Sequence, residues 1–147
     1  MLTAKFANGK TIELIGSEEL HFDYSGYHRA VYELRAKPDA IGLDELNALL
    51  DDESNTQKIE LVSPANPTAN VVSTPENYVL KIKAGIESRL VARETADAPI
   101  TYEDQLIIQL GQLTYTERLM RAQTLQIEAA LAQAAYTAMM SNTLLEG

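Results

Sequence analysis

The sequence predicts an α+β protein, in which an antiparallel β domain of about seven strands, meander-like or sandwich-like, is followed by a long C-terminal α-helix. In the first 112 residues, apolar and polar side chains alternate within short segments bounded by Gly, Pro, Asn and Ser, which is typical of strands. The segment 115–142 contains neither Gly nor Pro, which favours a helix. We therefore expect a β domain over residues 1–112 and a helical segment over 113–147.

Two hairpins are predicted at the N-terminus. Residues 2–7 and 10–15 alternate around Asn8-Gly9, a dipeptide that suits the positive φ angles of a type I′ turn. Gly16-Ser17 is expected to close this hairpin. The second hairpin should pair strands at 20–24 and 27–36 across the turn residues Ser25-Gly26.

The middle of the chain predicts one short helix and further strands. Leucines at 43, 46, 49 and 50 recur at helical spacing, which indicates an amphipathic helix over 43–51. The segment 63–75 carries three prolines and is expected to be a long loop. The remaining strands are expected at 57–62, 78–84, 87–94 and 103–110.

The C-terminal helix should begin at a capping box. Thr114 can accept a hydrogen bond from the amide of Glu117, whose carboxylate can reach back to the amide of Thr114. Ala, Leu, Gln, Met and Glu dominate the segment that follows, and these residues favour helix formation. At about 1.5 Å per residue, such a helix would be roughly 40 Å long.

One face of this helix has the spacing of a coiled-coil seam, in alternating steps of four and three residues. Residues 129–145 carry no charge, although a solvated helix normally has charged residues on its outer face. We therefore predict association through this helix; the alternative is that it packs along its own sheet. The predicted interaction residues are Met120, Thr124, Ile127, Leu131, Ala134, Tyr136, Ala138 and Met139.

Composition excludes several functional classes. The net charge of the chain is −9, and −8 of it belongs to residues 1–112, which argues against binding to nucleic acid or an anionic membrane. The absence of Cys removes disulfides, thiolate metal sites and cysteine nucleophiles. We expect neither a signal peptide nor a transmembrane segment, and hence a soluble protein of the bacterial host cytoplasm or of a virion tail.

An acidic patch gathers Asp44, Glu45, Asp51, Asp52 and Glu53. Asp51, Glu53, Asn55 and Gln57 stand at alternate positions, which loosely resembles the start of a calcium-binding loop. However, Thr56 stands where the sharp turn needs Gly, and Val62 stands where a bidentate Glu belongs. We therefore interpret the patch as a solvated helix end and loop.

No catalytic, metal-binding or cofactor-binding residues are predicted. The only histidines, His21 and His28, could approach each other across a hairpin, but they lack a third ligand at a fixed spacing. A strand-packing role is expected for Tyr24, Tyr27 and Tyr32, because few bases flank them. No glycine-rich phosphate loop occurs. We therefore expect a protein that is not an enzyme and that needs no cofactor.

The layout resembles small accessory proteins of phage or prophage tail and baseplate modules in Gram-positive bacteria. The resemblance rests on the AKFANGKTIELIG hairpin, the LDELNALL helix, the ARETADAPITYEDQLIIQLG strand pair and the uncharged terminal helix. It implies a structural role, with the chain assembled as a symmetric oligomer such as a trimer, or docked on neighbouring tail proteins. It contributes no functional residue.

Three functions follow from these observations. The first is a structural or interaction protein of a phage-derived particle that assembles through its C-terminal helix. The second is a small acidic inhibitor or decoy, such as a phage counter-defence protein, whose acidic patch occupies a basic site on a host protein. The third is a ligand- or carbohydrate-binding β domain, suggested by the three tyrosines alone.

Overall fold

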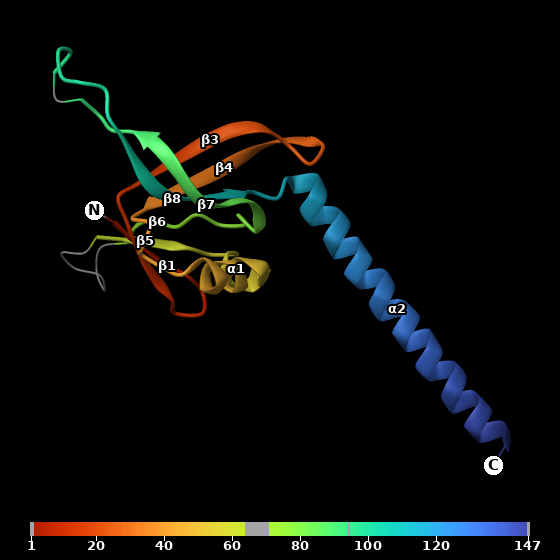
Figure 1. Ribbon diagram of the computed structural model, residues 1–147. Coiled ribbons are helices and arrows are strands. Elements are labelled where there is room, and N and C mark those ends of the chain that lie inside the picture. The colour runs from red at the N-terminus through yellow and green to blue at the C-terminus, as the bar shows by residue number, and fades with distance from the viewer. Residues whose placement is uncertain (1, 64–70, 94, 147) are drawn as a thin grey trace. The chain divides into compact units, whose positions relative to one another are not determined.

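The chain divides into two compact units, Met1–Leu113 and Thr114–Gly147, each of which is described by itself. The computed structural model describes residues 2–63, 71–93 and 95–146, with side chains up to residue 141 (Figure 1). The units meet one residue later than the predicted boundary, because Leu113 is buried in the first unit. Its backbone amide donates a hydrogen bond to the Asn77 carbonyl at 2.9 Å.

The first unit is built from eight strands within the described residues, together with a short α-helix and a 3₁₀ turn, and the second unit is one α-helix. The predicted α+β class is confirmed, with one strand more than the seven expected. In chain order the elements are β1 (Leu2–Lys5), β2 (Thr11–Leu14), β3 (Gly16–Tyr24), β4 (Tyr27–Ala36), α1 (Leu43–Asp51), η1 (Glu53–Asn55), β5 (Glu60–Val62), β6 (Val71–Ser73), β7 (Leu80–Leu90), β8 (Tyr102–Gly111) and α2 (Tyr115–Glu146).

The strands form two four-stranded sheets, in the orders β2-β1-β5-β6 and β3-β4-β8-β7. Every pair of neighbouring strands is antiparallel. β2 and β3 belong to different sheets although Ile15 alone separates them, so the chain passes from one sheet to the other at this residue. The Ile15 amide donates to the Arg35 carbonyl at 2.8 Å, which fixes the crossing against β4.

A single apolar core joins the two sheets to α1. The first sheet contributes Ala4, Ile12 and Leu14, and the second contributes alternate residues of β4 and β8, among them Leu34 and Ile108. Such alternation follows from the period of two in a strand. The helix covers this core with Leu46, Leu49 and Leu50, all of them buried. The leucine spacing therefore predicted the bounds of α1 correctly, and three of its four leucines are buried as expected, whereas Leu43 is 43% exposed.

The two hairpin turns differ from each other in their backbone angles. At the first turn only Gly9 has a positive φ (+89°), so the predicted type I′ turn is wrong. The Gly9 amide instead donates to the Phe6 carbonyl at 2.9 Å, which closes a four-residue turn. In the second hairpin, Ser25 and Gly26 have φ angles of +52° and +87°, as a two-residue type I′ turn requires.

Several strand boundaries also differ from prediction. β5, expected over 57–62, begins only at Glu60. β3 begins at Gly16, where a turn was expected, because residues 16–24 pair continuously with β4. β7 runs without a break from Leu80 to Leu90, so the strands expected at 78–84 and 87–94 are one; Gly85 pairs with Ile107 inside the ladder instead of ending it. The expected loop over 63–75 contains β6, while residues 64–70 of that prediction lie outside the described part of the chain.

Candidate interaction surface

α2 begins with the reciprocal cap that the sequence predicted. The Thr114 amide donates to Oε1 of Glu117 at 3.0 Å, and the Glu117 amide donates to Oγ1 of Thr114 at 3.2 Å. These bonds satisfy backbone donors that the start of a helix leaves without an intrahelical acceptor. The helix contains 32 residues and is therefore about 48 Å long.

Six of the eight predicted interaction residues lie along one stripe of α2. We call this stripe the seam face. Its large side chains are exposed: Met120 by 55%, Ile127 by 60% and Leu131 by 65%. The seam face consists of Met120, Thr124, Ile127, Leu131, Ala134 and Ala138.

The one polar residue of the seam face already has a hydrogen-bond acceptor within its own helix. Oγ1 of Thr124 donates to the Met120 carbonyl at 3.0 Å. Its hydroxyl can therefore enter a dry interface without losing its hydrogen bond, while its methyl group contributes to packing. Thr124 is thus compatible with an apolar contact along the whole stripe.

The other two predicted interaction residues do not belong to the seam face. At about 100° per residue, Tyr136 lies about 160° from Met120 around the helix axis, and Met139 about 100°. Tyr136 instead belongs to a second stripe with the same three-and-four spacing, which we call the opposite face. The opposite face consists of Ala122, Leu125, Ala129, Ala132 and Tyr136.

The opposite face was not predicted, although its spacing is present in the sequence. Leu125 and Tyr136, its two large residues, are 66% and 59% exposed. Its spacing is hidden because alanine fills the three other positions. Two apolar stripes on opposite sides explain why α2 is less amphipathic than α1.

The charged residues of α2 lie in its first half, apart from Glu146 at its last position. Those of the first half are Glu117, Arg118, Arg121 and Glu128, and residues 129–145 have none. Arg121 and Glu128 are one heptad apart and flank the seam face on the same side. The remainder of the helix offers an assembly partner apolar and neutral side chains.

The predicted acidic patch is engaged by contacts within the first unit. Glu45 forms an ion pair with Lys10, and Asp51 forms one with Lys81 at 2.7 Å. Asp52 caps η1: its Oδ1 accepts hydrogen bonds from the Ser54 hydroxyl and amide, which hold the pKa of Asp52 below its usual value. The run of acids after α1 thus ends one helix and starts the next turn. Asp44 and Ser54 are exposed, whereas Glu53 is half-buried.

The two histidines lie on the β3–β4 hairpin but pair with different partners. Nδ1 of His28 contacts Oδ1 of Asp23 at 2.8 Å across the ladder, and Nε2 of His21 lies 3.7 Å from Glu19. Among the described residues, no group of three His, Cys, Asp or Glu side chains could hold a metal ion.

The three tyrosines of this region do not form one platform. Tyr24 and Tyr27 face each other beside the turn, and the Arg29 guanidinium lies 6.0 and 5.6 Å from their ring centroids. Tyr32 instead packs edge-to-face on Tyr78 at 5.4 Å. Burial and the nearby Glu19 carboxylate raise the pKa of Tyr78 to about 12.

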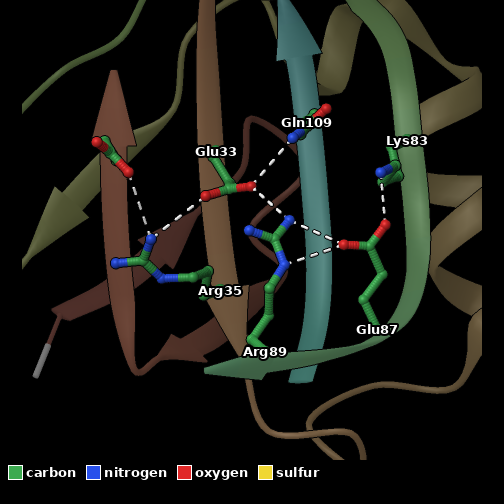
Figure 2. Close-up of polar contacts among 7 residues, drawn as sticks. Glu33, Arg35, Lys83, Glu87, Arg89 and Gln109 are labelled. Atoms are coloured by element: carbon green, nitrogen blue, oxygen red, sulfur yellow. Dashed lines mark hydrogen bonds and ion pairs between the residues drawn. The ribbon is translucent and has the colours of Figure 1, made fainter. Parts of the chain in front are cut away.

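A buried ion cluster crosses the second sheet, and sequence reasoning missed it (Figure 2). Glu33 on β4 is only 2% exposed. Its Oε1 accepts from Arg89 Nη2 and from Gln109 Nε2, each at 3.0 Å, and its Oε2 accepts from Arg35 Nη1 at 3.3 Å. Glu33 looks like any other polar position in an alternating strand, so its burial could not be read from the sequence.

Both arginines of the cluster are shared with other carboxylates. Arg35 also lies 3.5 Å from Glu18, and Arg89 lies 2.8 Å from Glu87. Hydrogen bonds from Lys83 and Arg89 lower the pKa of Glu87 despite partial burial. Through these shared contacts the cluster connects β3, β4, β7 and β8.

A cleft of about 450 Å³ lies beside the cluster, lined by residues that include Ile15, Arg89 and Gln105. Oε1 of Gln105 is buried and has no hydrogen-bond partner among the described residues, although its Nε2 donates to Glu103 at 2.8 Å. Since that oxygen is itself screened from solvent, the cleft offers a ligand no free polar anchor at this residue.

Comparison with known proteins gives no match: no family model, no curated protein and no solved structure is significantly similar to this chain. Among the helices of the described residues, none has both the length and the apolar character needed to cross a membrane. The function must therefore be argued from the surface of α2 and from the polar contacts of the first unit.

Proposed function

We propose that this chain is a non-enzymatic structural or interaction protein that assembles with copies of itself through α2. The observation that carries the proposal is the pair of apolar stripes on that helix. Their large side chains, Met120, Ile127 and Leu131 on one side and Leu125 and Tyr136 on the other, are each at least 55% exposed. Contiguous exposed apolar surface of this kind marks protein–protein contact sites.

The first unit supports a scaffold role rather than a chemical one. Its core residues all come from positions before Leu113, so its stability does not depend on burying α2. The charged side chains that cluster in the second sheet form ion pairs with one another, as Glu33 does with Arg35 and Arg89. A carboxylate held in this way is poorly placed to transfer a proton to a substrate.

The resemblance to tail and baseplate accessory proteins supplies a setting for such an assembly, and we include a phage-derived particle in the proposal on that ground. The self-association itself rests on α2 alone. A decoy role for the acidic patch receives less support, because Glu45 and Asp51 already pair with lysines of the same unit.

The test is the oligomeric state of the full chain and of Leu131→Glu, measured by sedimentation equilibrium. We expect the full chain to associate as its concentration rises. Leu131→Glu should weaken this association at least tenfold, because a charge would then be buried in the seam. A chain ending at Leu113 should be folded and monomeric.

The matched control is Gln126→Glu, which adds the same charge to the same helix about 120° from the seam face. It should leave the association nearly unchanged. A full chain that remains monomeric at high concentration contradicts the proposal. So does an association that persists in the chain ending at Leu113.

A further inference from the structure

Resting on the proposed self-association, we infer that two copies of α2 pair antiparallel through the seam face, with Met120 of each copy opposite Leu131 of the other. The occupant of this surface is thus a second copy of the chain. The inference depends on the flanking charges of the seam and on which side chains meet in each layer.

The charges favour an antiparallel orientation. In the heptad notation abcdefg, the seam residues occupy the core positions a and d. In a parallel coiled coil, each e residue, which follows d, faces a g residue of the partner helix, which precedes a. Arg121 and Glu128 both occupy e positions. The g positions hold Thr116, Gln123, Ala130 and Thr137. A parallel pair would therefore place neither Arg121 nor Glu128 beside a residue of opposite charge on the partner helix.

In an antiparallel pair, the e positions of one helix face the e positions of the other. Arg121 of one copy then faces Glu128 of the other, and the two-fold axis repeats this contact, so both charges are matched twice. Because the two residues are one heptad apart, this contact also fixes the register. The antiparallel arrangement thus brings opposite charges together without any further residue.

The core layers agree with this register. With Arg121 opposite Glu128, Met120 meets Leu131 and Thr124 meets Ile127, each contact occurring twice. Every one of these four layers contains at least one large apolar side chain. A parallel pair in register would bury the same six large side chains but would stack Thr124 on Thr124, whereas the antiparallel register covers each Thr124 with an Ile127.

This pairing has a consequence for the oligomer. An antiparallel helix pair is isologous, with the same patch on both subunits, and it closes as a dimer. A trimer on one shared stem requires parallel helices and therefore conflicts with it. The opposite face remains outside the contact, so higher assemblies would be built from this dimer.

Disulfide trapping distinguishes the orientations, because the chain has no native Cys. Met120→Cys and Leu131→Cys chains, one of them carrying a size tag, are mixed in equal amounts in a glutathione redox buffer. The antiparallel register predicts a mixed disulfide at least tenfold more abundant than either symmetric one. Predominant symmetric disulfides overturn the inference, and the proposed self-association survives that result.

Charge exchange provides a second readout on the full chain. Arg121→Glu and Glu128→Arg should each weaken dimerisation about tenfold, since each places two like-charge contacts in the dimer. The double exchange should restore the affinity of the original chain. Arg118→Glu, which lies about 160° from Met120, is the control and should change little.

Each outcome has a definite reading. Single exchanges that leave dimerisation unchanged overturn the antiparallel register, as does a double exchange that fails to restore it. A chain that is monomeric under all conditions overturns both the register and the proposed function.

Discussion

Among single residues, Glu33 is the one whose substitution we expect to cost the most stability. Its carboxylate is buried and accepts hydrogen bonds from Arg35 on the same strand, Gln109 on β8 and Arg89 on β7. A buried ion pair is weak evidence for net stability, because desolvation offsets much of the attraction. Replacing Glu33 itself is a different matter, because its buried carboxylate is the acceptor that Arg35, Arg89 and Gln109 share.

Glu33→Gln should lower the free energy of unfolding by about 3 kcal/mol. The neutral amide oxygen accepts more weakly from the two arginines than a carboxylate does, and the amide NH2 of the new Gln would face the NH2 of Gln109, a second donor. Urea denaturation of the chain measures this change.

Glu18→Gln is the matched control, because Glu18 contacts the same Arg35 guanidinium from an exposed position. Its loss should change stability by no more than about 1 kcal/mol. Equal effects of the two substitutions would show that burial of Glu33 does not govern the energetics of the cluster.

At the scale of elements, the two hairpin turns show how local sequence becomes geometry. Gly26 adopts a φ of +87° in a two-residue turn, where an L side chain is strained. We expect Gly26→Ala to destabilise the first unit by about 1 kcal/mol. Thermal or urea unfolding of the variant tests this.

Gly42 offers a matched control for that substitution. It precedes α1 with a φ of −67°, and a Cβ built there would lie within 4 Å of nothing. Gly42→Ala should therefore leave stability unchanged within about 0.5 kcal/mol. A comparable loss at both glycines would contradict the assignment of strain to the turn at Ser25-Gly26.

Elements with a strong local signal could be predicted from the sequence. The leucine spacing located α1, the Thr114–Glu117 cap located the start of α2, and alternation located β4 and β8. Elements decided by pairing could not be located in this way. Gly85 reads as a strand break, yet β7 continues through it because β8 provides a partner along its length.

Of the candidate interaction surface, only the seam face was predicted, because it alone has a strong local pattern in the sequence. The seam face repeats large side chains at a fixed spacing, which a sequence displays directly. The opposite face depends on Leu125 and Tyr136, eleven residues apart with alanines between them. The burial of Glu33 depends on residues of β7 and β8 far along the chain, and no local pattern encodes such a contact.

At the scale of the whole molecule, the two units differ in what holds them together. The first has a core that joins two sheets and α1. The second is a helix of 32 residues whose large apolar side chains, as far as the structure describes them, are exposed. An isolated helix in water is marginal, because its stability in proteins comes chiefly from packing one face.

We therefore expect the helicity of α2 to depend on protein concentration. Circular dichroism at 222 nm should lose part of its helical signal on dilution below the dissociation constant, while the first unit stays folded. A chain ending at Leu113 is the control and should give a concentration-independent spectrum. A helical signal that is unchanged by dilution, in a sample shown to be monomeric, would contradict this expectation.

The crossing between the sheets has one more consequence. A Cβ added to Gly16 would lie 2.6 Å from Nη2 of Arg35, the same side chain that contacts Glu33. Positions 16 and 35 are therefore coupled. Any side chain at position 16 would displace the Arg35 guanidinium and weaken its hydrogen bond to Glu33. In a lineage of such chains, we would look for compensating changes in which a bulkier residue at 16 accompanies a shorter one at 35.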